Sequence, residues 1–116
     1  MRRAWRLRRQ SDFERLKAHG KRWRHELIML SALPNGLPYN RYAFIANKRL
    51  GNAVARNRTR RRLREAMRRF ALKQGHDIAL IARANLAQQP YNMIVQALEE
   101  LLRRAELHSE QSEGDP

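Results

Sequence analysis

Apolar residues recur along this chain at two spacings, and each spacing predicts a different kind of element. Two stretches repeat apolar residues every three or four positions, as a helix with one buried face does. They predict helices over residues 52–73 and 90–107, with buried stripes formed by Leu63, Ala66, Met67 and Phe70 and by Ile94, Ala97, Leu98, Leu101 and Ala105. Shorter stretches rich in branched and aromatic residues predict strands over 27–33, 41–47 and 77–83.

Residues with special backbone preferences mark the expected ends of the helices. Ser11 and Glu14 have the spacing of a capping box, so a short helix is expected to begin at Ser11 and to end near His19. Gly20 is expected to end this helix in the left-handed conformation, and Gly75 to end the helix over 52–73. Pro90 is a favoured first residue for the last helix.

The order of these elements predicts one α+β sandwich domain over residues 11–107. Asn35-Gly36, between two prolines, is a strong turn signal, and the strand over 41–47 is expected to return beside the strand over 27–33. A single helix separates the strands over 41–47 and 77–83, which favours a β-α-β unit.

Charge changes the picture from fold to partner. The 116 residues include 25 Lys+Arg and 11 Asp+Glu, for a net charge of +14. Of the bases, 23 lie at or before Arg83, whereas six of the acids follow it. This segregation indicates a polyanionic partner. Residues 1–10, with five arginines, are expected to form a mobile basic arm, and residues 108–116 a disordered acidic tail.

Several other classes of protein fit poorly. The chain has no Cys, so disulfides and thiolate metal sites are unavailable. No apolar run approaches the roughly 20 residues that span a bilayer, and none follows the basic N-terminus as in a secretory signal. We therefore expect a cytoplasmic protein with no membrane partner. The scattered carboxylates and the four His residues form no recognisable catalytic group, so no catalytic residues or metal ligands are expected in the protein.

The segment from Arg56 to Arg69 holds eight arginines and a single acid. On a helix, one flank of the buried stripe carries Asn57, Arg61, Arg64 and Arg68 and the other carries Arg58, Arg62 and Arg69, while Arg56 falls near the N-terminal end of the stripe. Like charges one turn apart repel by about a few tenths of a kcal/mol, so nearly unmixed basic flanks indicate a surface for phosphate groups. Just before it, residues 48–52 join a strand to a helix N-terminus, where backbone N–H groups and the helix dipole favour an anion.

The same residues carry a family resemblance. The run Lys48-Arg49-Leu50-Gly51-Asn52-Ala53-Val54, followed by Arg56-Asn57-Arg58 and further basic residues, resembles the signature of the bacterial ribonuclease P protein subunit. Asp12-Phe13 with Leu16, the later His19-Gly20, and Ile78-Ala79 with Ile81-Ala82-Arg83 fit the family in order. The resemblance covers about residues 7–107.

The resemblance implies an α-β-β-β-α-β-α domain with a four-stranded sheet and a left-handed β-α-β crossover, against the usual hand. It implies a protein that forms a 1:1 complex with a catalytic RNA. The RNA removes the 5′ leader of precursor tRNA by Mg²⁺-dependent hydrolysis, so Mg²⁺ is expected in the RNA. The enzyme is thus a ribonucleoprotein whose chemistry is done by its RNA.

The resemblance also assigns site residues. For the RNA subunit these are Lys48, Arg49, Asn52, Arg56, Asn57, Arg58, Arg60, Arg61, Arg64 and Arg68. Phe13 matches an aromatic residue of the first helix that lines a cleft for the leader. The chain departs from the family at Lys17 and near Ser31, where aromatic residues are common, so more charge and less stacking are expected there. Tyr42 and Phe44 are expected to complete this cleft or, equally, to be half-buried strand residues.

Two further interpretations stay open on composition alone. A ribosomal or other structural RNA-binding protein would share the basic charge, and so would a binder of double-stranded DNA, although no convincing helix-turn-helix pair precedes the basic helix. Trp5 and Trp23 lie among arginines, where they could stack on RNA bases or pack an anchored arm.

Overall fold

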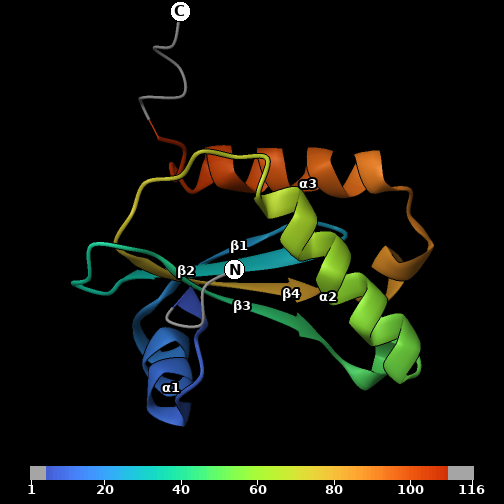
Figure 1. The fold of residues 1–116 in the computed structure, drawn as a ribbon, viewed down its shortest axis with the longest axis horizontal. Helices are drawn as coiled ribbons and strands as arrows, with labels where there is room; N and C mark the ends of the chain where they lie inside the picture. The colour runs from blue at the N-terminus through green and yellow to red at the C-terminus, as the bar shows by residue number, and fades with distance from the viewer. Residues whose placement is uncertain (1–4, 110–116) are drawn as a thin grey trace, which may run out of the picture.

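The computed structural model of the chain describes residues 5–109 (Figure 1). In chain order its elements are α1 (Gln10–His19), β1 (Lys21–Arg24), β2 (Ile28–Pro34), β3 (Arg41–Ala46), η2 (Lys48–Leu50), α2 (Ala53–Met67), β4 (His76–Ala82), η3 (Ala84–Gln88) and α3 (Tyr91–Arg104), where η denotes a 3₁₀-helix. The α-β-β-β-α-β-α order is confirmed. It includes β1, a strand that the spacing of apolar residues does not reveal.

The four strands form one mixed sheet in the order β1-β2-β4-β3. β2 is antiparallel to both β1 and β4, and β3 is parallel to β4. The predicted β-α-β unit is confirmed, because α2 joins the parallel neighbours β3 and β4. The expected return of β3 beside β2 is wrong, because β4 lies between them. Ile78, Ala79 and Leu80 make β4 apolar on both faces, which suits an interior strand. The hand of the crossover stays an expectation from the family.

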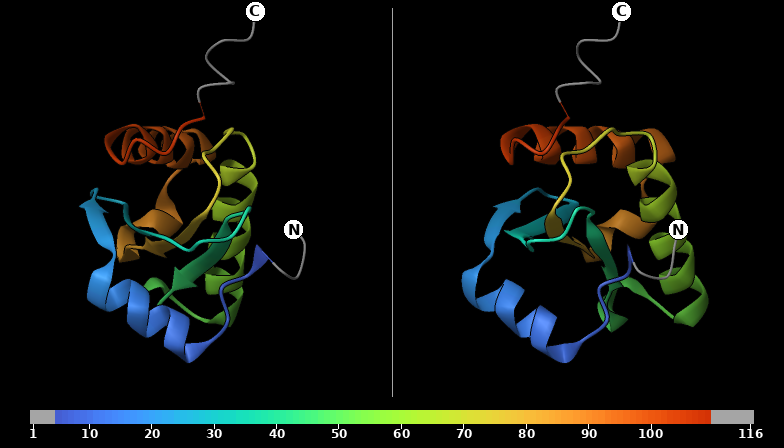
Figure 2. Two further views of the ribbon diagram at one scale, coloured as in Figure 1. Left: turned by 90° about the vertical axis from the view of Figure 1, so that its left-hand side faces the viewer. Right: turned by 60° about the vertical axis from the view of Figure 1, so that its left-hand side comes forward.

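The two faces of the sheet contribute to hydrophobic cores of different size. The larger core joins Ile28, Leu30, Ile78 and Leu80 of the sheet to α2 and α3 through residues that include Leu63, Ile94 and Leu98. Within residues 5–109, the smaller core on the other face has only Leu7, Leu16, Ala43 and Ala79 as buried members. Figure 2 shows α1 and α3 on opposite sides of the sheet, with α2 beside β3. The helix α1 is therefore the least deeply packed of the three.

The ends of α1 differ from the expectation. The helix begins at Gln10 with Arg9 as its N-cap and with no side-chain cap, so the capping box of Ser11 and Glu14 is wrong. Gly20 has φ −71° and ψ 154°, an extended conformation open to any residue, and not the left-handed one expected. A Cβ at Gly20 would lie 2.5 Å from the Leu16 carbonyl oxygen. Glycine is therefore required at position 20 because there is no space for a side chain.

Both long helices are shorter than the apolar pattern suggests. α2 ends at Met67, although Phe70 still packs on the larger core, and Gly75 with φ 96° precedes β4 and does not end the helix. In α3, Pro90 is the N-cap, one residue before the helix, and the last helical residue is Arg104. The stripes themselves are confirmed, since Leu63, Ala66, Met67, Ile94, Ala97, Leu98 and Leu101 are all buried.

Residues near both ends of the described chain are packed. The Leu7 N–H donates to the Tyr42 carbonyl oxygen at 2.8 Å, and the Leu7 side chain is buried, so this part of the expected mobile arm is anchored on β3. The Ser109 N–H donates to the Ala71 carbonyl oxygen at 2.9 Å. The rest of the expected arm (1–4) and tail (110–116) lies outside the described residues. No helix of the described chain is long and apolar enough to cross a membrane.

Candidate nucleic-acid interface

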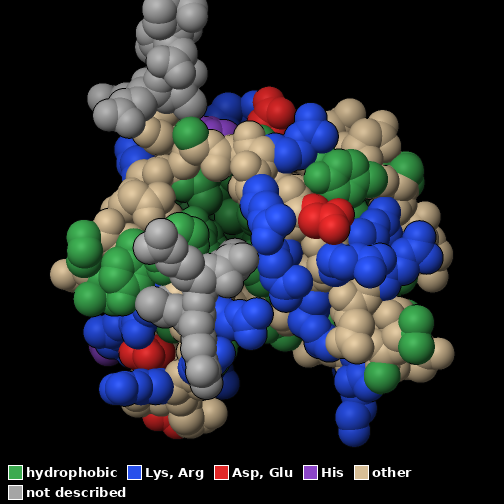
Figure 3. All heavy atoms as spheres, in the orientation of Figure 1, with side chains coloured by type: hydrophobic (Ala, Val, Ile, Leu, Met, Phe, Trp, Pro, Cys, Tyr) green, Lys and Arg blue, Asp and Glu red, His purple; other side chains and the backbone are tan. Residues whose placement is uncertain are grey.

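The helix α2 presents arginines on the surface while its other side enters the larger core. Leu63 and Ala66 are fully buried on this helix, whereas Asn57, Arg58 and Arg61 are exposed and Arg56, Arg60, Arg62 and Arg64 are half-buried. Arg68 and Arg69, which follow the last helical residue, are also exposed. Figure 3 shows Lys and Arg side chains gathered along the course of α2. The sequence-derived picture of a buried stripe between two basic flanks is therefore confirmed.

Within residues 5–109, none of the α2 arginines forms an ion pair with a carboxylate; the ion pairs there involve Arg15, Arg41 and His25. Some α2 arginines are instead held by neutral groups. Arg60 donates to the side-chain oxygen of Asn57, and Arg62 to the carbonyl oxygen of Gln89. Burial, followed by repulsion from Arg58, lowers the pKa of Arg62. The arginines on the two flanks are thus not neutralised by any carboxylate of the described chain.

The junction between β3 and α2 leaves its basic side chains exposed to solvent. Leu50 is buried and anchors η2, while Lys48 and Arg49 are exposed. Gly51 has φ 146°, and a Cβ there would meet the Ala55 Cβ at 3.0 Å. The Asn52 side-chain oxygen accepts a hydrogen bond from the Ala55 N–H at 2.9 Å. Asn52 therefore caps α2, and its predicted contact with RNA stays a prediction for the remaining side-chain N–H groups.

A cleft of about 410 Å³ separates α1 from the sheet. Phe13, Lys17 and Ser31, three of the five predicted leader-binding residues, line it together. Its other lining residues are Leu16, Arg22, Met29, Ile45, Ala79 and Ile81. The cleft is thus apolar at its centre with Lys17 and Arg22 as cationic groups, an arrangement suited to a single strand whose bases seek apolar contact and whose phosphates seek charge.

Tyr42 and Phe44 do not belong to this cleft. Both pack on the larger core at the opposite face of the sheet, with ring centroids 6.2 Å apart. Side chains alternate along a strand, so Ala43 and Ile45 face α1 instead. Of the two roles left open for Tyr42 and Phe44, that of half-buried strand residues is therefore confirmed, and a place in the cleft beside α1 is wrong. Burial, opposed by a hydrogen bond from Asn40, raises the pKa of Tyr42.

The two aromatic side chains still reach the surface at the β3 edge. With Phe13 and Arg64 they line a hollow of about 340 Å³ beside the N-terminal segment. The Arg64 guanidinium carbon lies 5.6 Å from the centre of the Phe44 ring, which places this α2 arginine beside the aromatic pair. Trp23, by contrast, packs on the larger core, so packing is the role that the structure shows for it.

A hollow that the sequence did not predict lies at the other end of the cleft. Met29 and Ile81 line both the cleft and a hollow of about 600 Å³ that includes Arg49, Arg83 and Asn85. The cleft therefore continues toward the junction that precedes α2. The alternation of β2 and β4 is the signal that would have found Met29 and Ile81, since each lies two residues from a cleft residue, Ser31 and Ala79.

Comparison with known proteins decides the family. The model of the ribonuclease P family matches residues 1–106, nearly the whole chain. The chain belongs to the ribonuclease P protein family. The ribonuclease P protein component of Dehalococcoides mccartyi is 39% identical over 108 residues, covering 93% of this chain and 90% of the relative. That of Roseiflexus castenholzii is 41% identical over 108 residues, covering 90% and 88%.

Solved structures of ribonuclease P proteins have the same fold. The protein from Staphylococcus aureus matches with a TM-score of 0.83 at 26% identity, covering 92% of this chain and all of that one. The protein from Thermotoga maritima matches with a TM-score of 0.78 at 30% identity, covering 85% and 96%. Family membership places the chain in tRNA processing, and the alternatives of a ribosomal protein or a DNA binder lose their support.

Proposed function

We propose that this ribonuclease P protein binds the catalytic RNA through α2 and the 5′ leader of precursor tRNA through the α1 cleft, assisting RNA-catalysed removal of the leader. The observation that carries the proposal is the unpaired arginine surface of α2, which the cleft approaches through Met29 and Ile81. Two RNA segments can therefore lie on one continuous surface.

The contact with the RNA subunit rests on charge. The predicted residues Lys48, Arg49, Asn57, Arg58, Arg61 and Arg68 are exposed, and Arg56, Arg60 and Arg64 are half-buried on the same surface. Guanidinium groups bind phosphates with paired hydrogen bonds, and the release of counterions makes such binding strongly dependent on salt. Asn57 is engaged by Arg60, which supports an indirect role for Asn57 in orienting that arginine.

The contact with the leader rests on the shape and chemistry of the cleft. Phe13 offers a ring on which a base can stack, and Lys17 and Arg22 supply charge for the backbone. Ser31 is buried at the cleft floor and leaves room where a larger side chain would reduce it. Tyr42 and Phe44 can serve RNA only from the separate hollow at the β3 edge, together with Arg64.

In this proposal the RNA performs the chemistry and would hold Mg²⁺, which would supply Lewis-acid stabilisation of charge on the reacting oxygens. Two acids beside α1 are engaged by an arginine, because the carboxylates of Asp12 and Asp77 both accept hydrogen bonds from Arg41. Among the described residues, no group of three or more His, Asp or Glu side chains could hold a metal ion. The protein contributes binding and orientation.

Titration of a fluorescently labelled bacterial ribonuclease P RNA with the protein tests the proposal. We expect saturation at one protein per RNA, followed by tighter binding of precursor tRNA with a long leader than of mature tRNA. Binding that is equally tight to any structured RNA of similar length, with no preference for the leader, would contradict it.

A further inference from the structure

The helix α1, which forms one wall of the cleft, has few apolar anchors. Leu16 is the only buried residue of the helix, and the smaller core that receives it has just three other buried residues in the part of the chain that the structure describes. Phe13 packs on this core but stays half-buried because it also faces the cleft. Some other interaction must therefore define how α1 sits on the sheet.

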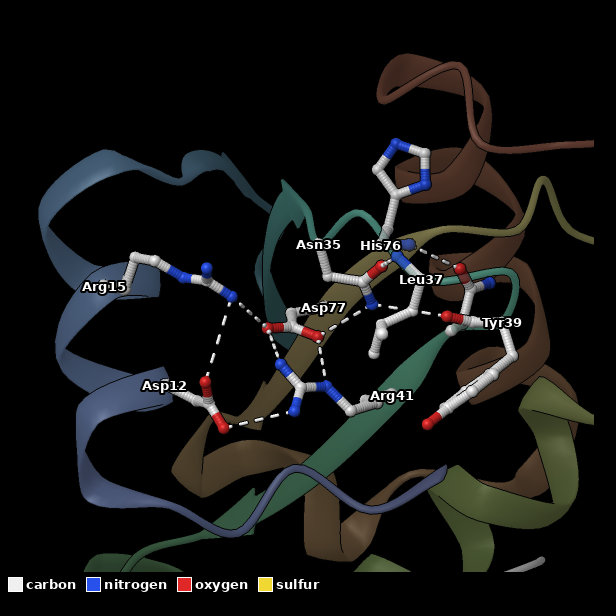
Figure 4. A network of polar contacts seen from close by, with 9 residues as sticks. Asp12, Arg15, Asn35, Leu37, Tyr39, Arg41, His76 and Asp77 are labelled. Atoms are coloured by element: carbon white, nitrogen blue, oxygen red, sulfur yellow. Dashed lines mark hydrogen bonds and ion pairs between the residues drawn. The ribbon is translucent and has the colours of Figure 1, made fainter. Parts of the chain in front are cut away.

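A buried carboxylate at the start of β4 provides that interaction (Figure 4). Asp77 is 0% exposed, and its two oxygens accept hydrogen bonds from Arg41 Nε and Arg41 Nη2, each at 2.8 Å. Asn35 Nδ2 donates to the same carboxylate at 3.0 Å. Arg41 and Asp77 are direct partners in the parallel register of β3 and β4. This doubly bonded pair is therefore a rigid part of the sheet.

Both members of the pair reach across to α1. Arg41 Nη1 donates to Asp12 Oδ2 at 3.2 Å, and Arg15 Nη2 donates to Asp77 Oδ2 at 3.3 Å. Arg15 Nη2 and Asp12 Oδ1 also lie 3.8 Å apart and form an ion pair within α1. The four side chains of Asp12, Arg15, Arg41 and Asp77, which we call the α1 clamp, hold two positive and two negative charges. Because these charges cancel, the clamp adds little to the attraction of RNA.

The positions of these residues on α1 connect the clamp to the cleft. Asp12 and Arg15 are three residues apart and occupy one flank of the helix. Phe13 and Lys17, which line the cleft, occupy the other flank, and Leu16 lies between the two flanks. A helix held at one flank cannot roll about its axis, so the clamp defines where Phe13 and Lys17 point.

We propose that Asp12, Arg15, Arg41 and Asp77 are positioning residues that fix the orientation of α1 and thereby the width of the leader cleft. The role in leader binding rests on the function proposed above, whereas the effect on α1 does not. A buried ion pair is a weak source of stability compared with apolar packing, which supports a role in geometry. The charge state of Asp77 suits this role. Burial alone would raise the pKa of Asp77, but hydrogen bonds from Arg41, Asn35 and Arg15 and the charge of Arg41 outweigh burial and hold this pKa below its usual range.

Measurement of the α1 position needs no RNA. The chain has no Cys, so Ser11→Cys on α1 and Gln96→Cys on α3, both at exposed positions, give two specific spin-label sites. Into this background we would place Asp12→Asn with Arg15→Gln, which leaves the net charge unchanged. Glu14→Gln is the control on the exposed side of α1. We expect a narrow distance distribution in the parent and the control and a broader or shifted one in the double variant. An unchanged distribution would overturn the proposal.

Assembled ribonuclease P then tests the consequence for substrate. We expect Asp12→Asn with Arg15→Gln to reduce the preference for long-leader over leaderless precursor by about fivefold or more, the least that losing one stacked base implies. The effect should appear in KM for the long-leader substrate, with kcat and RNA-subunit affinity unchanged. Asp12→Asn alone adds positive charge, so electrostatics alone predicts tighter leader binding, whereas the clamp predicts weaker binding.

The outcomes separate the two proposals. If the wild-type protein shows no leader preference, the proposed function fails, and the spin-label result still decides the clamp. If the wild type prefers the leader and the double variant matches Glu14→Gln in both measurements, the clamp has no positioning role.

Discussion

In the proposed leader site, Phe13 is the residue that can stack on a base, because it is the aromatic side chain among the residues that line the cleft. We predict that Phe13→Ala weakens binding of long-leader precursor by about 1–3 kcal/mol, the worth of one stacked base. Phe13→Tyr keeps the ring and should restore most of the affinity. Equilibrium binding to the assembled enzyme measures both variants, and an equal loss with leaderless tRNA would remove Phe13 from the leader site.

The lowered pKa of Asp77 predicts how the stability of the fold depends on pH. Its folded-state pKa lies below the usual 3.8, so the ionised carboxylate stabilises the fold above pH 3.8 and this contribution is lost as the pH falls through the lower folded value. Asp77→Asn should lower the free energy of unfolding at pH 7 by about 3–5 kcal/mol, because the largely buried Arg41 loses its doubly bonded charged partner and keeps only a single hydrogen bond to the Asp12 carboxylate.

Urea unfolding of the wild type and Asp77→Asn, measured from pH 6 to pH 3, tests this prediction. The difference between the two proteins should shrink below pH 3.8. A constant difference over this range would mean that the carboxylate contributes nothing through its charge.

Gly20 illustrates a glycine retained for space. The Cβ of Gly20→Ala would lie 2.5 Å from the Leu16 carbonyl oxygen and 2.8 Å from Leu16 Cδ1, so we expect a loss of about 1–3 kcal/mol in the free energy of unfolding. Gly36→Asn is the matched control, because nothing lies near its Cβ and Asn tolerates the φ of 74°. Urea unfolding compares the two, and equal stability of Gly20→Ala and wild type would refute the steric account.

At the residue scale, the sequence predicted which side chains share a face of an element better than it predicted what that face packs against. Residue spacing placed Tyr42 and Phe44 on one face of a strand, which is confirmed, but it could not say which face meets α1. Likewise, Ser11 and Glu14 have the pattern of a cap, yet the helix starts one residue before Ser11, because the chain enters α1 from a segment anchored by Leu7. Tertiary contacts decided both cases.

Among the elements, α2 combines a buried apolar stripe with the arginines of the proposed RNA contact. Its buried stripe keeps the helix in place whether or not RNA is bound, and its flanks are free of ion pairs within the described chain. Replacing Arg56, Arg58 and Arg61 by Gln should therefore leave the fold intact and weaken binding to the RNA subunit. The log–log salt slope should become shallower by about 0.7–0.9 for each phosphate that the protein no longer neutralises.

A matched variant separates this site from general charge. Replacing Lys21, Arg24 and Arg103 by Gln removes the same charge from exposed positions on β1 and α3. We expect a much smaller loss of affinity for the control than for the α2 variant, with native circular dichroism in both. Equal losses would show that α2 is not a specific contact.

Element boundaries and pairing were the weaker part of the sequence prediction. The helical stripe continued through Phe70, but the chain leaves the helix at Met67 and turns toward β4. The Asn35-Gly36 turn was identified, yet β3 does not return beside β2, because pairing with the apolar β4 satisfies both strands. Local signals report turns, whereas the order of strands depends on which surfaces must be buried.

At the scale of the whole molecule, the segregation of charge anticipated a protein with a basic working surface, and the signature over residues 48–58 specified the family. Neither could reveal that the cleft runs from α1 to the hollow beside Arg49, since that path is formed by Met29 and Ile81 from different strands. Nor could they reveal the α1 clamp, whose members lie as far apart in the sequence as Asp12 and Asp77. Such sites depend on the folded sheet.

Reconstituted cleavage tests the central claim most directly. A bacterial ribonuclease P RNA would be mixed at low Mg²⁺ with the wild-type protein, the α2 variant or the Lys21, Arg24 and Arg103 control, and the release of leader from precursor tRNA measured. We predict cleavage with the wild type and the control, strongly reduced cleavage with the α2 variant, and none with protein alone. Cleavage by protein alone, or equal activity of the wild type and the α2 variant at every protein concentration, would contradict the account.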